Sequence, residues 1–366
     1  MGLSIGIIGL PNVGKSTTFN ALVKMQSAQS ANYPFCTIEP NRAVVPVLDS
    51  RIDNLAKIVN PQKIHYSVIE FVDIAGLVRG ASRGEGLGNQ FLSHIKEVDA
   101  VLHIVRCFEN SNITHVEGRI DPIEDIKIVE LELILSDISS LEKRISKLER
   151  ESKANRSIKK IIDMSKLLLN HLQNNNPVSS FDLRDSDEFL LLDKELRFLS
   201  NKVLIYGANV DENNLNVNNK YLDELFLYGK SNNIDVIKLC SKIEEDMIGL
   251  SDEERKEFLE SLGIEDSGLN QVVKLGFRKL GLISYFTAGV KEVRSWTIKN
   301  GYKAPKAASV IHNDFEKGFI RAEVISYSDF IKYNGEIGAK EAGVMRSEGK
   351  EYIVKDGDVI HFRFNV

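Results

Sequence analysis

The feature that most constrains the fold is a glycine-containing loop near the start of the chain. An apolar run rich in isoleucine covers residues 3–8, the next eight residues are GLPNVGKS, and the residues from Lys15 onward are typical of a helix. The loop fits the pattern G-x-x-x-x-G-K-[ST], and a strand before it and a helix after it are the context that the pattern requires. The sequence therefore predicts a Walker A phosphate-binding loop at residues 9–17.

Each part of this loop has a chemical role. The glycines let backbone N–H groups close around a polyphosphate, and the following helix directs the positive end of its dipole at it. Lys15 neutralises charge on the β- and γ-phosphates during catalysis, and the Ser16 hydroxyl ligates Mg²⁺. The alternative is a chance match in an α/β protein of another kind.

Three further residues are expected to complete the phosphate and magnesium site. Asp73 ends an apolar run at residues 68–73, as does the aspartate that holds Mg²⁺ in P-loop proteins, and Gly76 is placed to donate its N–H to the γ-phosphate. Thr37 lies between the two motifs, where a threonine completes the Mg²⁺ shell. The pattern D-x-x-G is common by itself, and a plain turn threonine is the alternative for Thr37.

Leu77 bears on the rate of hydrolysis. Many GTPases carry a glutamine at this position, after the D-x-x-G glycine, and it orients the attacking water. Leucine cannot polarise water, so we expect a low intrinsic rate that a partner controls. The glycine-rich residues 80–88 are typical of a switch segment, although a plain flexible loop has the same composition.

The residues Asn209-Val210-Asp211-Glu212 bear on the choice of base. GTPases normally carry Asn-Lys-x-Asp at this place, and the aspartate accepts hydrogen bonds from guanine. Here the lysine is missing and the acid is the longer Glu212. Adenine offers an acceptor at N1 and a donor at its amino group, so a guanine-reading carboxylate has no bidentate partner on it. The residues favour ATP over GTP and leave a GTPase open; Cys240 and Ser241 are candidates for a further backbone contact to the base.

Alternating strands and helices indicate an α/β fold with a parallel sheet. The predicted strands are residues 3–8, 68–73, 100–106, 202–208 and 235–239. Between the third and fourth strands, apolar residues spaced three and four apart form a coiled-coil seam on a helix. They are Leu131, Ile134, Ile138, Leu141, Ile145 and Leu148.

The chain therefore divides into three predicted parts. A P-loop nucleotide-binding domain comprises residues 1–130 and 200–281, and residues 131–199 form an inserted helical coiled-coil arm. From residue 282 the pattern changes to short alternating strands with glycine-containing turns, which predicts a small α+β unit at residues 282–366, called the C-terminal module below.

Composition excludes several classes of protein. The net charge of −5 gives no general attraction to nucleic acid, and we expect no DNA sequence specificity. Cys36, Cys107 and Cys240 lie far apart in sequence, which argues against a disulfide framework and a zinc site. The first residues lack a basic segment followed by a long apolar stretch, and no apolar stretch approaches about twenty residues, so we expect no secretory signal and a cytoplasmic protein without a membrane partner.

A local basic segment lies on the predicted arm. Eight basic residues and two acidic ones, Glu149 and Glu151, fall between residues 143 and 160. The basic residues are Lys143, Arg144, Lys147, Arg150, Lys153, Arg156, Lys159 and Lys160. Such a segment suits contact with a nucleic-acid backbone, and a solvated helix face is the alternative.

Taken together, these motifs resemble the Obg-like ATPase (YchF) family of P-loop proteins. The matching segments are GLPNVGKST at 9–17, NYPFCT at 32–37, DIAGLV at 73–78, GLGNQFLSHI at 86–95 and VRCF at 105–108. The Asn-x-x-Glu departure at 209–212 is itself typical of that family, and the C-terminal module resembles a TGS domain of the β-grasp type. The resemblance implies ATP hydrolysis with tolerance of GTP, a coiled-coil arm and association with ribosomes.

The resemblance also implies roles for single residues. Mg²⁺ is expected at Ser16 and Thr37, and adenine at Asn209 and Val210 of the base loop that Glu212 ends. The phosphates are expected at Asn12, Val13, Gly14, Lys15, Ser16 and Thr17. His115 matches a histidine proposed to replace the missing glutamine, although a surface loop histidine fits equally well. Asn12 matches an asparagine that ligates K⁺ in cation-dependent relatives, so a K⁺ requirement is a hypothesis.

Three functions remain open at this point. The first is an ATP hydrolase that acts as a switch on ribosomes, and the second is a GTPase switch that differs in base choice. The third is a binding module in which nucleotide is a conformational ligand and turnover is incidental.

Overall fold

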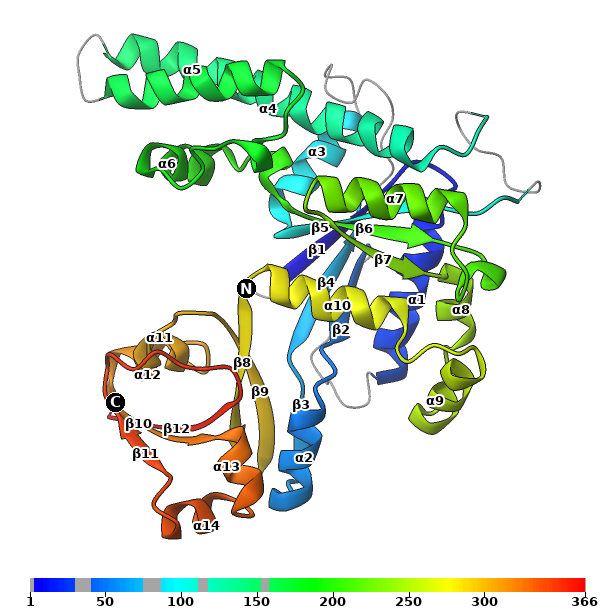
Figure 1. Cartoon of the computed structure of the whole chain (residues 1–366). Coiled ribbons are helices and arrows are strands. Elements are labelled where there is room, and N and C mark those ends of the chain that lie inside the picture. The colour runs from blue at the N-terminus through cyan, green and yellow to red at the C-terminus, as the bar shows by residue number, and fades with distance from the viewer. Residues whose placement is uncertain (1–2, 30–40, 75–86, 111–117, 153–157, 366) are drawn as a thin grey trace.

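The computed structural model describes residues 3–29, 41–74, 87–110, 118–152 and 158–365 of the 366-residue chain. Two six-stranded sheets organise these residues, and a helical arm projects from the first sheet (Figure 1). No helix in the described ranges is long and apolar enough to cross a membrane.

Sheet A carries the predicted phosphate loop. Its order is β2-β4-β1-β5-β6-β7, and all neighbours are parallel except β2 and β4. The strands are β1 (Leu3–Ile8), β2 (Arg42–Pro46), β4 (Val68–Asp73), β5 (Ala100–Arg106), β6 (Val203–Asn209) and β7 (Asp235–Leu239). The five predicted strands are confirmed. β2 was not predicted; it is a five-residue edge strand that ends in proline, which edge strands tolerate.

Helices cover both faces of sheet A. Helices α1 and α10 pack on one face, and α4 and α7 on the other (Figure 1). The helices around this sheet are α1 (Lys15–Gln29), α3 (Leu87–Glu97), α7 (Lys220–Ser231), α8 (Ser241–Asp246), α9 (Asp252–Ser261) and α10 (Gly268–Lys279), with the 3₁₀ turn η6 (Glu212–Asn214). This layered arrangement explains why the strands are nearly continuous apolar runs.

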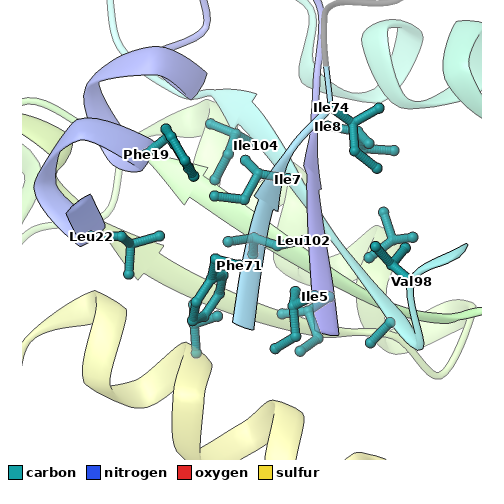
Figure 2. Close-up of a cluster of buried hydrophobic side chains, with 14 of the residues drawn as sticks. Ile5, Ile7, Ile8, Phe19, Leu22, Phe71, Ile74, Val98, Leu102 and Ile104 are labelled. Atoms are coloured by element: carbon teal, nitrogen blue, oxygen red, sulfur yellow. The ribbon is translucent and has the colours of Figure 1, made fainter. Parts of the chain in front are cut away.

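The main core lies between α1 and the strands of sheet A. Phe19 and Leu22 of α1 point toward strand residues that include Ile7 and Phe71 (Figure 2). Ile7, Leu22 and Phe71 are fully buried, and burial of each such side chain contributes about 1.5–3 kcal/mol. The core therefore holds the first turn of α1, and with it the phosphate loop, against the sheet.

The inserted arm is a helical hairpin with a third helix packed on it. The long helix α4 (Pro122–Ser152) packs along α5 (Lys159–Gln173). The other elements of the arm are η4 (Val178–Ser180), α6 (Asp187–Leu196) and η5 (Leu199–Asn201). The predicted seam is confirmed from Ile134 to Leu148, but the prediction for Leu131 is wrong, because this side chain is 43% exposed. The first seam residue thus lies one turn later than expected.

A buried carboxylate joins the arm to sheet A. Asp137 of α4 accepts hydrogen bonds from Leu199 N at 2.8 Å, Ser200 N at 2.9 Å and Ser200 Oγ at 2.7 Å. Burial raises the pKa of Asp137 to about 6 despite these hydrogen bonds. The contact fixes α4 to the short turn that leads directly into β6.

Sheet B forms the C-terminal module and has the order β11-β10-β12-β8-β9-β3. Its strands are β3 (Lys63–His65), β8 (Leu282–Ala288), β9 (Glu292–Lys299), β10 (Phe319–Ser326), β11 (Arg346–Glu348) and β12 (Asp358–Phe364). The short helices α11 (Ala304–Ala308), α12 (Asn313–Lys317), α13 (Tyr327–Lys332) and α14 (Glu336–Glu341) pack around it.

One strand of sheet B comes from the N-terminal part of the chain. Strand β3 pairs in parallel with β9, and α2 (Ser50–Val59) packs on the same sheet. The division into residues 1–130 with 200–281, 131–199 and 282–366 stays a prediction. Relative to those bounds, α4 begins earlier, at Pro122, and α2 and β3 from the N-terminal part of the chain pack on the C-terminal module (Figure 1).

Candidate nucleotide-binding site

The predicted phosphate loop joins β1 to α1 and contains several residues with positive φ. Gly9 has a φ of 153°, Asn12 of 64° and Gly14 of 99°. A Cβ atom on Gly14 would lie 2.1 Å from Asn209 Nδ2, and one on Gly9 would lie 2.6 Å from the Ile104 carbonyl oxygen. Both positions therefore require glycine, for backbone conformation and for space. The strand, loop and helix follow one another as the sequence predicts.

A buried network of hydrogen bonds ties the phosphate loop to the end of β6 and the start of α8. Asn209, at the end of β6, is 3% exposed, and its Nδ2 donates to the Val13 carbonyl at 2.8 Å. Its Oδ1 accepts from Ser241 N and Ser241 Oγ, both at 3.1 Å. Thr18 Oγ1 lies 2.7 Å from Ser241 Oγ and 3.0 Å from the Gly14 carbonyl. The phosphate loop, the end of β6 and the start of α8 thus form one hydrogen-bonded unit.

The predicted contact of Asn209 with the base has to be compatible with this network. A side-chain amide carries two N–H donors, and the structure directs one of them to Val13. The supporting roles of Thr18 and Ser241 were missed, because their hydroxyls act through the fold and match no phosphate-binding pattern. Ser241 was considered only as a backbone contact to the base.

Lys15 and Asp73 meet at the end of the loop. Lys15 Nζ donates to the Ile74 carbonyl at 3.1 Å and lies 3.7 Å from Asp73 Oδ1. The two side chains are only 11% and 20% exposed. The ammonium group is therefore held at the C-terminal end of β4, beside the mouth of the loop.

Asp73 has an oxygen that suits a metal ion. Its Oδ1 is buried and accepts no hydrogen bond from the described residues. A buried carboxylate oxygen without such a partner is costly unless a cation satisfies it. Ser16, which follows Lys15 at the start of α1, supplies a hydroxyl. These are the hard oxygen ligands that Mg²⁺ prefers.

A magnesium ion at this place needs further ligands from its substrate. Across the described ranges, no three His, Cys, Asp or Glu side chains form a ready-made metal cluster. Mg²⁺ in nucleotide sites is typically held by one or two protein oxygens together with phosphate oxygens and water. The donor set at Ser16 and Asp73 fits that arrangement.

A cavity of about 810 Å³ extends from the phosphate loop across the ends of β5, β6 and β7. This volume lies within the usual range for a small-molecule site. The residues that line it are Leu10, Pro11, Asn12, Gly14, Lys15, Ser16, Thr17, Phe108, Glu109, Asn110, Asn209, Val210, Asp211, Glu212, Asn213, Cys240, Ser241 and Lys242. Apart from buried Val13, the predicted phosphate residues and the predicted base residues therefore line one cavity.

The far end of the cavity carries an ion pair at its surface. Glu212 Oε1 lies 2.5 Å from Lys242 Nζ, and the two side chains are 47% and 71% exposed. The hydrogen bond to Glu212 raises the pKa of Lys242. Asp211 accepts a hydrogen bond from Asn214 N at 3.0 Å and thereby caps the N-terminus of the 3₁₀ turn η6. Lys242, in the first turn of α8, was not predicted from the sequence.

Phe108 provides an aromatic wall of the same cavity. The Arg106 guanidinium lies 4.8 Å from the centre of its ring, and Arg106 Nε donates to the Phe108 carbonyl at 3.1 Å. Arg106 is 1% exposed, so the position of Phe108 is fixed from within the protein. Residues 105–108 entered the sequence predictions only through the family resemblance, so no role was predicted for Phe108.

Comparison with known proteins identifies the family. Over its full length the chain is 54% identical to the Haemophilus ducreyi protein named ribosome-binding ATPase YchF, and it covers 100% of that protein. It is 49% identical to the Bacillus subtilis protein of the same name, again over 100% of both chains. The chain belongs to the YchF family.

Structures and family models agree with that assignment. A solved Schizosaccharomyces pombe YchF GTPase is 38% identical, with a TM-score of 0.90 over 99% of this chain and 98% of that one. Residues 4–131 match a family described as 50S ribosome-binding GTPase. Residues 282–365 match a C-terminal family of YchF GTPases that is described as a protein of unknown function. The resemblance that the motifs indicated is therefore confirmed, together with the fold class.

Three predicted site residues of this YchF family chain lie outside the described residues: Thr37, Gly76 and His115. Their predicted roles stay predictions, as does the switch role of residues 80–86. The structure brings together the remaining predicted residues, at the carboxyl ends of the strands of sheet A. Ligands bind at this edge in open α/β sheets.

Proposed function

We propose that this protein binds Mg²⁺-ATP, hydrolyses it and acts as a nucleotide-dependent switch on ribosomes. The observation that carries the proposal is the ion pair of 3.7 Å between Lys15 Nζ and the buried Asp73 Oδ1, an oxygen that accepts no hydrogen bond from the described residues, at the mouth of the glycine loop. The relatives named ribosome-binding ATPase support the choice of nucleotide and of partner.

The proposed reaction is attack of water on the γ-phosphate, with catalysis by positioning and charge neutralisation. Lys15 Nζ is already held by the Ile74 carbonyl, so its charge needs no reorganisation as negative charge develops. Ser16, Asp73 and Thr37 would hold Mg²⁺, which supplies further neutralisation when bound. Gly76 and the loop amides would donate to phosphate oxygens, and His115 is the proposed group that positions the water.

Adenine is the proposed base because of the state of Glu212, and two further residues of the cavity suit a purine of either kind. Glu212 is engaged by Lys242, so it is not a free acceptor of the kind that reads guanine. The second N–H of Asn209 remains for a purine ring nitrogen, next to buried Val210. Phe108 offers a ring against which a purine can stack, without preference between bases.

A GTPase is the second candidate, because the solved relative and one matching family are described as GTPases. A single calorimetric experiment separates the two. ATP, ADP, GTP and GDP are titrated into the full chain with Mg²⁺. We expect ATP to bind more tightly than GTP. Tighter binding of GTP would overturn the base assignment, and no binding of any nucleotide would overturn the whole proposal.

Cation dependence is tested in the same preparation. Mg²⁺ at Ser16 and Asp73 predicts that removal of divalent cations by EDTA abolishes turnover. A K⁺ ion is proposed at Asn12, whose left-handed backbone lies in the phosphate loop. Turnover is expected to be faster in KCl than in NaCl at equal ionic strength, and equal rates would remove K⁺ from the proposal.

The arm is the proposed ribosome contact, because several of its basic side chains point into solvent. Arg144 is engaged within the arm by Glu195 at 2.9 Å and Glu151 at 3.6 Å. Within the basic segment at residues 143–160, the described basic residues with exposed side chains are Lys143, Lys147, Arg150, Lys159 and Lys160. Phosphate-backbone contacts weaken with salt and with each lost charge.

Sedimentation with ribosomes tests this contact. The double variant Lys143→Glu and Lys147→Glu is expected to bind more weakly and with a smaller salt dependence. Lys256→Glu on α9 is the control, since its charge is paired with Glu260 away from the arm. Binding that is equal for all three proteins would exclude the arm. Hydrolysis that does not change when ribosomes are added would favour the binding module with incidental turnover.

Two further assignments belong to this proposal. The C-terminal module is proposed as a TGS domain, on the basis of its short strands and its position in the family. A ribosome-bound switch also places the protein in the cytoplasm.

A further inference from the structure

The segment between β2 and β4 belongs to two regions of the molecule at once. Residues 47–67 follow one strand of sheet A and precede the next, yet their helix α2 and strand β3 lie in the C-terminal module (Figure 1). The chain therefore leaves the nucleotide-binding sheet, enters sheet B and returns.

The inner end of this excursion lies at the nucleotide site. Strand β4 ends at Asp73, and Asp73 N donates to the Asn41 carbonyl at 2.9 Å. β2 pairs with β4 from Arg42 opposite Val72 to Pro46 opposite Val68. Any shift of Asp73 toward or away from a bound cation therefore acts on both strands of this pair.

The outer end is held firmly in the C-terminal module. Strand β3 pairs with β9 from Lys63 opposite Glu292 to His65 opposite Arg294. Gln62 N donates to the Val290 carbonyl at 3.0 Å, beside this ladder. Because strand pairing fixes the register, β3 cannot slide along β9 without breaking several hydrogen bonds at once.

Side chains add to this attachment. Ile52 and Leu55 of α2 are fully buried in a cluster with Phe286 and Val293 of the C-terminal module. Arg51 Nη1 donates to Asp356 Oδ2 at 2.6 Å. Asn54 Nδ2 donates to Tyr327 Oη at 3.0 Å. Burial opposes the charge on Arg51, but the hydrogen bonds to Asp49 and Asp356 outweigh it and raise its pKa.

We infer that residues 47–67 form a coupling segment that links occupancy of the nucleotide site to the packing of the C-terminal module. The inference rests on the proposed nucleotide-binding function. The pair β2–β4 is continuous with α2 and β3, so both ends of the segment move together or one attachment breaks. Thermodynamic coupling is reciprocal, so weakening the outer attachment must change nucleotide affinity from a distance.

Hydrogen–deuterium exchange on the full chain gives the first test. Exchange is compared without nucleotide, with Mg²⁺-ADP and with a non-hydrolysable Mg²⁺-ATP analogue. We expect nucleotide to change exchange in β3 and β9, whereas β11, at the opposite edge of sheet B, stays constant. Equal exchange of β3 and β9 in all three states overturns the inference.

Variants at the outer attachment give the second test. Arg51→Ala removes the ion pair, and Tyr327→Phe removes only the hydroxyl that Asn54 contacts, so it preserves packing should Arg51→Ala fail to fold. The matched control is Arg363→Ala, which removes another exposed ion pair of the same module, with Glu323 at 3.0 Å. Neither test position nor control position lines the nucleotide cavity.

Calorimetry then measures the Kd for Mg²⁺-ATP of the wild type and the three variants. We expect Kd to change by about fivefold for Arg51→Ala, the low end of typical couplings, by less for Tyr327→Phe in the same direction, and not at all for Arg363→Ala. Identical Kd values for all four proteins overturn the coupling and leave nucleotide binding intact. A wild-type chain that binds no nucleotide overturns the proposed function instead.

Discussion

The two halves of the nucleotide cavity are built in opposite ways. At the phosphate half, Asn209 and Ser241 are 3% exposed, and their polar atoms are satisfied within the protein. At the base half, Glu212 and Lys242 form a single ion pair, and the side chains are 47% and 71% exposed. The first half is fixed by the fold, whereas the second depends on two side chains that water reaches.

This difference separates affinity from selectivity. Every nucleoside triphosphate presents the same phosphates, so a rigid phosphate half binds all of them equally well. Discrimination between purines depends on matched polar groups around the base. Substitutions in the exposed half are therefore expected to change base preference without affecting the fold.

The largest expected effect comes from removing the fixed charge of the phosphate half. Lys15→Ala should lower kcat for ATP by about 100- to 1000-fold, as with the loss of one transition-state donor. Steady-state phosphate release measures it. Lys24→Ala is the control on the same helix, because Lys24 makes an exposed ion pair with Glu245. A Lys15→Ala protein that keeps wild-type turnover would contradict the enzyme assignment.

A pH effect on stability is expected beside the phosphate half. Glu244 of α8 is 5% exposed and accepts from Leu269 N at 3.1 Å. Burial raises its pKa from 4.5 to about 7. The folded protein thus holds this proton more tightly than the unfolded chain, so stability falls as pH rises from about 5 to about 7 and then levels off.

Glu244→Gln isolates that effect, because the amide accepts the same hydrogen bond and does not ionise. Urea unfolding at pH 5 and pH 8 should show a loss of stability in the wild type that exceeds the loss in Glu244→Gln by about 2–3 kcal/mol. Equal losses in the two proteins would show that ionisation of Glu244 does not lower the free energy of unfolding.

A smaller stability effect is expected from the phosphate half itself. Asn209→Ala removes the donor to the buried Val13 carbonyl and the acceptor of Ser241 N, whereas Ser241 Oγ keeps its contact with Thr18 Oγ1. The free energy of unfolding should fall by about 1–3 kcal/mol, and ATP and GTP should both bind more weakly. Asn213→Ala is the control, since this side chain is exposed on the rim of the same cavity. Equal stability of the two variants would contradict the conclusion that buried hydrogen bonds fix the phosphate half.

The smallest effect is expected at the exposed half. Glu212→Gln or Lys242→Ala should leave the unfolding midpoint unchanged, because exposed ion pairs contribute little to stability. The ratio of the Kd values for GTP and ATP should nevertheless change by about threefold to tenfold. Competition between the two nucleotides measures it. A change in stability without a change in that ratio would mean that the pair supports the fold and does not select the base.

The phosphate half was largely predictable from the sequence. Its determinants lie in consecutive residues at 9–17, and Asp73 follows a clear apolar strand. Local order of this kind depends on backbone geometry that only certain residue types allow, as the φ of 99° at Gly14 shows. Such constraints are visible without the tertiary structure.

The remainder depends on contacts between distant segments. Lys242 meets Glu212 only because β6 and β7 are neighbours in sheet A. β3 is three residues long, too short for a periodicity signal, and its partner β9 begins at Glu292. Leu131 fits the heptad spacing, yet it is exposed because the packing with α5 begins later on α4. Periodicity gives a candidate face, and only the partner shows which residues it covers.

The pairing of Lys63 with Glu292 has a consequence for biosynthesis. At roughly 5–20 residues per second, about ten to fifty seconds separate translation of the two strands. During that interval the nascent chain carries an α2 whose apolar face, including Ile52 and Leu55, has no partner to cover it. The earliest segment of the future sheet B is therefore the most open to misassociation, and it becomes protected only as the last quarter of the polypeptide emerges.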